Sequence, residues 1–239
     1  MMSPSSHPVR SWRTVFCVVL LALTAGLSAQ SSRSTSAIQS TGTRQSPEAL
    51  AKALQQRYQG IADFTADFSQ SYRGGVLRQR TLEQGTVAVK KPGLMRWEYV
   101  KPEKKEFVSD GRKTYLYIPP DRQVVVGDAD TEGASTSSLF LAGKGDITRD
   151  FTAATAESPV EGTVALKLTP RRRQPDYEYL VVAVDPASLQ IRGLVTHDAQ
   201  GGDSTLTFTN LKENTGISDK VFAFRIPRGV DVVNNAAPK

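Results

Sequence analysis

Few residues in this sequence have the chemistry for catalysis. The 239 residues include one cysteine and two histidines, and beyond residue 29 only His197 remains. A metal site built on histidine needs two or three such ligands, and no H-E-x-x-H, G-x-S-x-G or P-loop pattern occurs. His197 and Asp198 would need a serine from elsewhere in the chain to form a hydrolase triad. A lone histidine at the end of a predicted strand is more often a polar surface residue, so we expect neither an enzyme nor a metal site.

Two charged runs match ligand-binding loops only in part. The run Asp128 to Gly133 fits the first, third, fifth and sixth positions of a calcium loop, but Leu139 stands at the twelfth, where a bidentate glutamate belongs. Arg171 to Arg173 is the densest basic run, and its position between two prolines predicts a solvated turn. The formal net charge of +6 is well short of the basic stripe of a nucleic-acid binder. We therefore expect no cofactor and no nucleic-acid partner.

The first residues have the pattern of a secretory signal peptide. Arg10 and Arg13 precede nine consecutive apolar residues, Val15–Leu23, and small residues follow up to Ala29. The apolar run is too short to span a bilayer, which needs about 20 residues. We predict a signal peptide over 1–29, a flexible Ser/Thr-rich tether over 30–46, one folded domain over 47–233 and a disordered tail over 234–239. An uncleaved membrane anchor is the alternative for the first segment.

The predicted domain begins with a helix and continues with strands. Ser46 is a good N-cap, Pro47 suits the first helical turn, and apolar residues recur at spacings of three and four up to Tyr58. After Gly60 the apolar pattern changes to a period of two, which predicts about ten strands joined by short turns. Such short connections favour antiparallel pairing, and a sheet of this length tends to curl. The fold class is therefore mainly β (α+β), with a strongly curved antiparallel sheet and few helices.

Aromatic residues alternate along the predicted strands. They are Phe64, Phe68, Trp97, Tyr99, Tyr115, Tyr117, Phe208, Phe222 and Phe224. For any one of them an ordinary core position is the simpler interpretation. However, only the helix over 47–58 and a short segment near Leu139 are available to fill the concave side of the sheet. This shortage of covering helices favours a ligand cavity.

A set of motifs resembles the periplasmic outer-membrane lipoprotein carrier family (LolA). The specific part is Lys91–Tyr99 (KPGLMRWEY), followed by Pro102 and Phe107–Gly111. The resemblance covers roughly residues 47–233 in the family's order. Supporting segments are Ser138–Gly143, Leu166–Pro170, Phe222–Phe224 and Pro227–Val232.

The resemblance implies a half-open β-barrel with a lid of a few short helices over an apolar cavity that holds acyl chains. It implies a monomeric periplasmic carrier with acylated lipoproteins as cargo. Its partners would be an inner-membrane ABC transporter that releases lipoproteins and an outer-membrane receptor that accepts them.

Site residues follow from the same resemblance, position by position. Lys91 matches an Arg that holds the lid shut in many family members, and Leu141 and Ala142 match the lid segment that it meets. Met95 matches a cavity-mouth position implicated in partner contact. Phe64, Phe68 and Trp97 match cavity-lining positions. With the aromatic residues of the alternating strands, the expected acyl-chain cavity comprises Phe64, Phe68, Trp97, Tyr99, Tyr115, Tyr117 and Phe208.

Other functions remain open at this point. A module of the same fold would bind another lipid or sense envelope stress, although a sensor usually has a further domain. The outer-membrane receptor itself would need an acylated cysteine after the signal peptide, and this sequence has none there. A secreted hydrolase would have to use His197.

Overall fold

The computed structural model describes residues 45–74, 79–129, 141, 143 and 145–234. The predicted signal peptide, the tether up to residue 44, Ala142 and the tail from residue 235 lie outside the described residues. Leu139 and most of the acidic run that begins at Asp128 lie outside them as well.

The domain opens with helix α1 (Pro47–Gln59), which confirms the helix expected over 47–58. The side chain of Ser46 accepts a hydrogen bond from the backbone N–H of Ala49, at 3.2 Å, and so caps the first turn. Leu50, Leu54 and Tyr58 form the buried face of the helix. This helix contacts α3 (Ile147–Asp150) and the strands at one end of the sheet.

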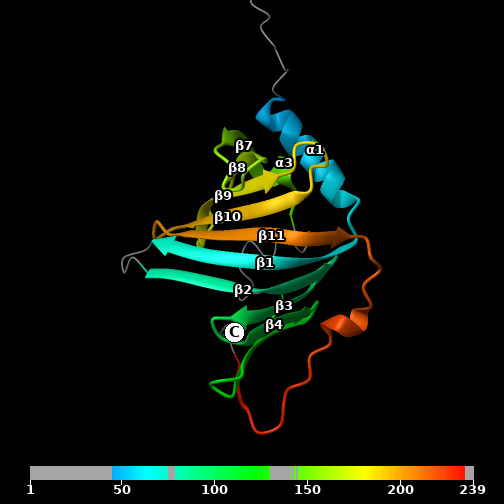
Figure 1. The fold of residues 1–239 in the computed structure, drawn as a ribbon, viewed down its shortest axis with the longest axis vertical. Coiled ribbons are helices and arrows are strands. Elements are labelled where there is room, and N and C mark those ends of the chain that lie inside the picture. The colour runs from blue at the N-terminus through cyan, green and yellow to red at the C-terminus, as the bar shows by residue number, and fades with distance from the viewer. Residues whose placement is uncertain (1–44, 75–78, 130–140, 142, 144, 235–239) are drawn as a thin grey trace, which may run out of the picture. The chain divides into compact units, whose positions relative to one another are not determined.

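One sheet of twelve strands forms the rest of the domain, and it is open and strongly curved (Figure 1). This confirms the expected mainly β fold. The strands are β1 (Asp63–Gly74), β2 (Gln79–Lys90), β3 (Leu94–Lys101), β4 (Lys105–Asp110), β5 (Lys113–Ile118), β6 (Gln123–Asp128), β7 (Phe151–Ala156), β8 (Val164–Pro170), β9 (Tyr177–Val184), β10 (Ile191–Asp198), β11 (Asp203–Glu213) and β12 (Asp231–Asn234). Their order is β12-β6-β5-β4-β3-β2-β1-β11-β10-β9-β8-β7.

Neighbouring strands pair antiparallel with one exception. β12 lies parallel to β6 at the sheet edge, with Val232 opposite Val124. Residues 224–226, although apolar in part, form no strand. Phe224 lies in an irregular segment, and its ring stacks on that of Tyr115, with the ring centroids 5.0 Å apart.

The register of the strands separates two faces of the sheet. On the inner face Ala66 pairs with Val87, Val87 with Trp97 and Trp97 with Phe107, which gives one continuous apolar row. α1, Leu141 and Ile147 of α3 pack with this face in a single hydrophobic core.

The outer face of β3 and β4 contacts the short 3₁₀ helix η1 (Asp219–Phe222). Phe222 is 1% exposed, and Val108 and Val124 are fully buried. Both faces of this part of the sheet are therefore covered.

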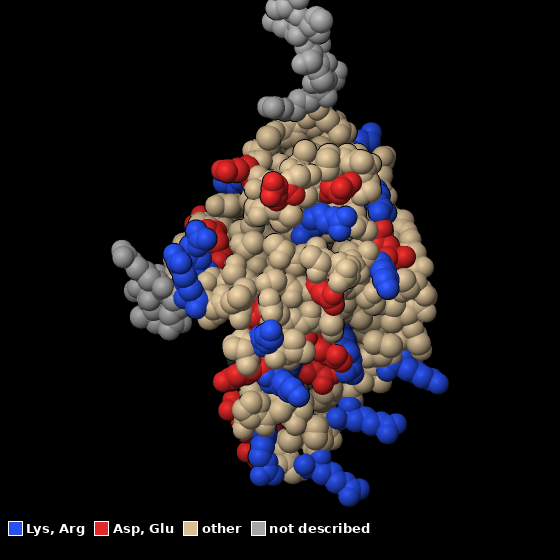
Figure 2. Space-filling model, viewed as in Figure 1, with Lys and Arg blue, Asp and Glu red and all other residues tan. Residues whose placement is uncertain are grey.

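Charged side chains of both signs are interspersed over the face of the molecule that Figure 2 shows. Among the described residues no helix is long and apolar enough to cross a membrane.

Candidate functional site

The inner face collects most of the aromatic residues expected in the cavity. Phe64, Phe68, Trp97 and Phe208 are buried there, and Tyr99 is partly buried. The ring of Phe68 meets those of Trp97 and Tyr99 edge to face, with both centroid distances 5.0 Å. Such edge-to-face contacts stabilise the cluster beyond the apolar area that it buries.

Two predicted cavity residues lie on the opposite face. Tyr115 pairs with Val108 and Tyr117 with Glu106, which places both side chains on the outer face of the sheet. Their rings pack against Phe224, at 5.0 Å and 6.3 Å between centroids. The expectation that they line the cavity is therefore wrong, because strand alternation turns them away from the inner row that contains Leu116.

Met95 has a different setting from the one expected. It lies on the inner face between Val89 and Ser109 and is 1% exposed. A residue of an open cavity mouth would be accessible to partners. Met95 therefore belongs to the interior, in the same hydrophobic core as Leu54 and Leu141.

One set of contacts, called the latch below, joins α1, the turn between β2 and β3, and Leu141. Tyr58 donates its hydroxyl hydrogen bond to the backbone carbonyl of Leu141. Lys91 donates from Nζ to the backbone carbonyl of Tyr58, and the same ammonium lies 3.4 Å from the centroid of the Tyr58 ring. The stem of Lys91 also packs so closely on Gly143 that a Cβ there would lie 2.7 Å from Lys91 Cδ. Lys91 therefore meets the Leu141 segment through Tyr58 and Gly143.

Burial changes the titration of both latch side chains. It raises the pKa of Tyr58 above its ordinary value, so the phenol stays a hydrogen-bond donor. Burial lowers the pKa of Lys91 to about 8, although the carboxylate of Glu213 opposes this shift. Lysine lacks the planar guanidinium group that arginine would offer here, with its several N–H donors. Its side chain also becomes neutral more readily.

A second set of contacts holds α1 against the sheet. Arg57 Nη2 lies 2.5 Å from Glu213 Oε2, and Arg57 Nε donates to the carbonyl of Ser188 at 2.7 Å. These contacts fix the helix end that carries Tyr58, so the phenol meets the Leu141 carbonyl.

The cavity that Tyr58 and Leu141 line with other described residues is very small. A cavity of about 10 Å³ remains among Tyr58, Ile61, Phe64, Leu141, Ile191, Phe208, Leu211 and Glu213. Drug-sized ligands need pockets of about 300–1,000 Å³. This cavity has no room for an acyl chain, and the arrangement is called the closed state below.

The family model described as outer membrane lipoprotein carrier protein LolA matches residues 59–225. The chain belongs to the LolA family. Outer-membrane lipoprotein carrier proteins from Chromohalobacter salexigens and Hahella chejuensis are each 30% identical to it. The first match covers 80% of this chain and 90% of the relative, and the second covers 77% and 88%.

A solved structure of a LolA superfamily protein from Nitrosomonas europaea shares 12% identity, with a TM-score of 0.43. The match covers 75% of this chain and 98% of that chain.

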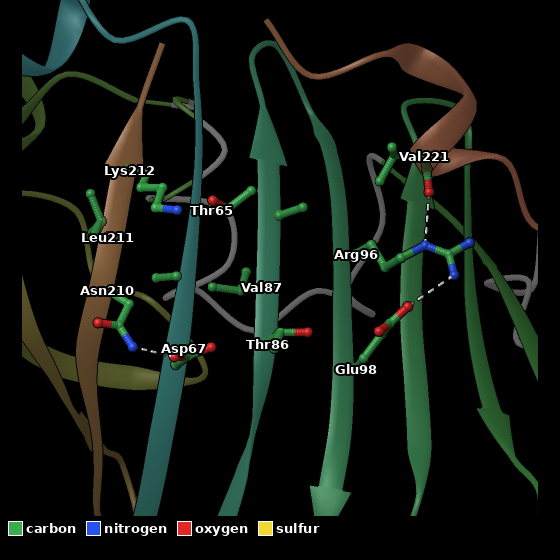
Figure 3. Close-up of a pocket in the computed structure, with 12 residues that line it drawn as sticks. Thr65, Asp67, Thr86, Val87, Arg96, Glu98, Asn210, Leu211, Lys212 and Val221 are labelled. Carbon is green, nitrogen blue, oxygen red and sulfur yellow. Dashed lines mark hydrogen bonds and ion pairs between the residues drawn. The ribbon is translucent and has the colours of Figure 1, made fainter. Parts of the chain in front are cut away.

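The outer face of the sheet in this LolA-family chain carries a polar groove, whereas the interior is apolar. The groove has a volume of about 660 Å³ and runs along β1, β2, β3 and β11 (Figure 3). Arg96 Nε donates to the carbonyl of Val221 at 2.7 Å, and Asn210 Nδ2 donates to Asp67 at 2.7 Å. Because charged groups of both signs line it, the groove is unsuited to hydrocarbon chains.

His197, the histidine considered for catalysis, contacts an aspartate and a tyrosine on the neighbouring strands. His197 Nδ1 lies 2.7 Å from Asp203 Oδ1, and its ring stacks on Tyr179 with the centroids 4.5 Å apart. Within the part of the chain that the structure describes, no three His, Cys, Asp or Glu side chains converge as metal ligands.

The latch lysine gives a pH-dependent prediction. Between about pH 8 and 10.5 the unfolded chain keeps the Lys91 proton, whereas the folded chain has lost it. The free energy of unfolding of the parent should therefore rise with pH in this window, relative to Lys91→Met, and stay level below it. We expect a gain on the order of 1 kcal/mol, because solvent screens the half-buried amine.

Urea unfolding of both proteins from pH 7 to 10.5 measures this difference, with Lys52→Met on the exposed side of α1 as the surface-charge control. Parallel pH profiles for the parent and Lys91→Met would contradict the prediction.

Proposed function

We propose that this chain is a periplasmic carrier that holds the acyl chains of lipoproteins against the inner face of its sheet. The observation that supports this most strongly is the apolar interior beneath the latch, in which Lys91 bonds to Tyr58 and Tyr58 bonds to Leu141. The LolA family match supports the same cargo.

The physical need for a carrier follows from the cargo. Each buried CH₂ group is worth about 0.8 kcal/mol, so exposing one acyl chain of about 14 such groups to water costs roughly 11 kcal/mol. A carrier must offset this free energy and still release the chain. A covered apolar face that opens at a small cost meets both requirements.

The route of transport is part of the proposal. The signal peptide that we predict over 1–29 exports the chain to the periplasm. There the carrier takes lipoproteins from an inner-membrane ABC transporter and delivers them to an outer-membrane receptor. Met95 reaches a partner only when the lid opens, since it is buried in the closed state.

Native mass spectrometry tests the central step. The full-length chain is expressed in a Gram-negative host and purified from the periplasm. It is then mixed with a synthetic triacylated lipopeptide below its micelle concentration, or with the same peptide without acyl chains. We expect a one-to-one complex with the lipopeptide and none with the bare peptide. Equal binding of the two peptides, or binding of neither, would contradict the proposal.

A matched pair of variants tests the latch. Tyr58→Phe removes the hydroxyl that reaches Leu141 and should speed uptake of the lipopeptide several-fold, because a buried hydrogen bond is worth about 1 kcal/mol. Tyr115→Phe removes a hydroxyl that lies 3.2 Å from Asp110 on the outer face and should leave uptake unchanged. Equal uptake rates in the two variants would show that the contact does not hold the lid.

A further inference from the structure

The indole N–H of Trp97 is buried without a hydrogen-bond partner. Trp97 is 3% exposed, and its Nε1 is the one buried side-chain nitrogen or oxygen without a partner among the described residues. Buried polar groups are paired in the great majority of cases, and an exception needs a physical explanation. A donor that lies in the face where cargo binds is explained if the cargo supplies the acceptor.

The surroundings of Trp97 offer the indole no acceptor. On the inner face its register partners are Val87 and Phe107, and the Phe68 ring packs on it edge to face. Ser109 lies opposite Met95 on the same face, and its hydroxyl is turned to Gly93, to whose carbonyl it donates at 2.8 Å. A phenylalanine would supply the same kind of ring contact with Phe68 and leave no donor unpaired.

The position of Trp97 indicates which part of a cargo molecule lies beside it. Tyr99 follows two residues later on the same face, about 7 Å along the strand. The ammonium of Lys105 lies 4.2 Å from the centroid of the Tyr99 ring and 2.5 Å from Glu83 Oε1. Trp97 therefore lies two residues along β3 from a charged rim, which the Lys105–Glu83 pair forms beside Tyr99. At such a rim an apolar chain would meet its polar head group.

We propose that the Trp97 N–H binds the carbonyl oxygen of an acyl ester at the junction between the hydrocarbon chain and its glycerol. The inference rests on the proposed function, because it assumes that acyl chains enter this interior. Indole nitrogen only donates and an ester carbonyl only accepts, so the two groups match. The hydrocarbon then lies among Phe64, Phe68 and Phe208, and the glycerol faces the Lys105–Glu83 pair.

A matched pair of lipids tests the assignment. 1-Palmitoylglycerol carries the carbonyl, whereas 1-O-hexadecylglycerol has the same chain length and head group without it. Binding of each to the full chain is measured by displacement of a fluorescent fatty-acid probe. We expect the parent to bind the ester about tenfold more tightly than the ether, which is the effect of pairing one buried donor. Trp97→Phe should bind the two lipids equally.

Two further measurements keep the test independent of folding defects. Phe68→Leu removes a neighbour of Trp97 but keeps the donor, so it should retain the preference for the ester. The sequence has two tryptophans, and Trp12 lies in the predicted signal peptide, so Trp97 is the only tryptophan of the exported protein. In the exported protein the ester, and not the ether, should shift the Trp97 emission to the red as the N–H forms its hydrogen bond.

The outcomes separate the two proposals. Equal binding of ester and ether by the parent overturns the role of Trp97 and leaves the carrier function standing. An ester preference that survives in Trp97→Phe also overturns it. Binding of neither lipid contradicts the carrier function and this inference together.

Discussion

Replacement of Leu141 by alanine is expected to destabilise the closed state strongly and to increase access for apolar ligands. Leu141 is 1% exposed, and its side chain forms one wall of the 10 Å³ cavity next to Phe64 and Phe208. Truncation of a fully buried leucine costs about 2–5 kcal/mol, because it removes apolar contacts and leaves a cavity. The backbone carbonyl that accepts the Tyr58 hydrogen bond is unchanged. The variant therefore removes only the buried Leu141 side chain, which we call the plug, and keeps the hydrogen bond of the latch.

The enlarged space should itself bind ligand. Dry cavities lined by aliphatic and aromatic side chains take up small apolar molecules such as benzene. We therefore expect benzene to raise the melting temperature of Leu141→Ala and to leave that of the parent unchanged. Calorimetry gives the melting temperatures, and urea titration gives the free energy of unfolding.

Leu180→Ala is the matched control for this prediction. Leu180 is fully buried on β9 but does not line the cavity. It should lose a comparable amount of stability without faster uptake of the acyl probe. If both variants took up the probe equally fast, general loosening of the core would explain the effect, and the plug role of Leu141 would be wrong.

Asp63→Ala should detach the segment that leads from β11 to η1. The buried carboxylate of Asp63 accepts hydrogen bonds from the backbone N–H groups of Thr215, Gly216 and Ile217, at 2.7, 3.0 and 3.3 Å. The Thr215 hydroxyl adds a fourth at 3.0 Å. Hydrogen bonds to a charged group contribute about 1.5–3 kcal/mol, so we expect a loss of about 3 kcal/mol in urea unfolding.

The same carboxylate makes the free energy of unfolding fall at acid pH. Burial alone would raise the pKa of Asp63, but the hydrogen bonds from Thr215, Ile217 and Gly216 outweigh it and hold the pKa below its ordinary value of 3.8. The stabilisation is therefore complete above about pH 4 and is lost as the pH falls through the folded-state pKa. The difference in stability between the parent and Asp63→Ala should shrink below pH 4.

Asp67→Ala provides the comparison for this variant. Asp67 is exposed and accepts one hydrogen bond, from Asn210, so its loss should cost about 1 kcal/mol or less. A loss in Asp63→Ala no larger than that in Asp67→Ala would contradict the anchoring role.

Local sequence signals determined where the elements lie. Ser46 and Pro47 specify the start of α1 because their effects act within one helical turn. The alternation after Gly60 specifies extended strands, and short connections specify antiparallel pairing within β1 to β6 and within β7 to β11, but not the pairing of β1 with β11 or of β12 with β6. The motif from Lys91 to Tyr99 identified the family, and with it the interior position of Trp97.

Only the tertiary structure decided which faces of the strands are internal. β5 carries apolar or aromatic residues on both faces, since Tyr115 and Tyr117 alternate with Leu116 and Ile118. Alternation specifies a face only when the other side is wet. Here the chain returns more than 100 residues later and places Phe224 over Tyr115, and no local pattern in β5 contains that information.

The latch was equally a product of the tertiary structure. Lys91 reaches a carbonyl 33 residues away, and Tyr58 reaches one 83 residues away. Backbone carbonyls are present at every residue, so an acceptor leaves no mark in the sequence. The sequence placed Lys91 and Leu141 in one functional unit through family resemblance. Only the packing of α1 on the curved sheet showed that Tyr58 joins them, and that Trp97 is left with an unpaired donor.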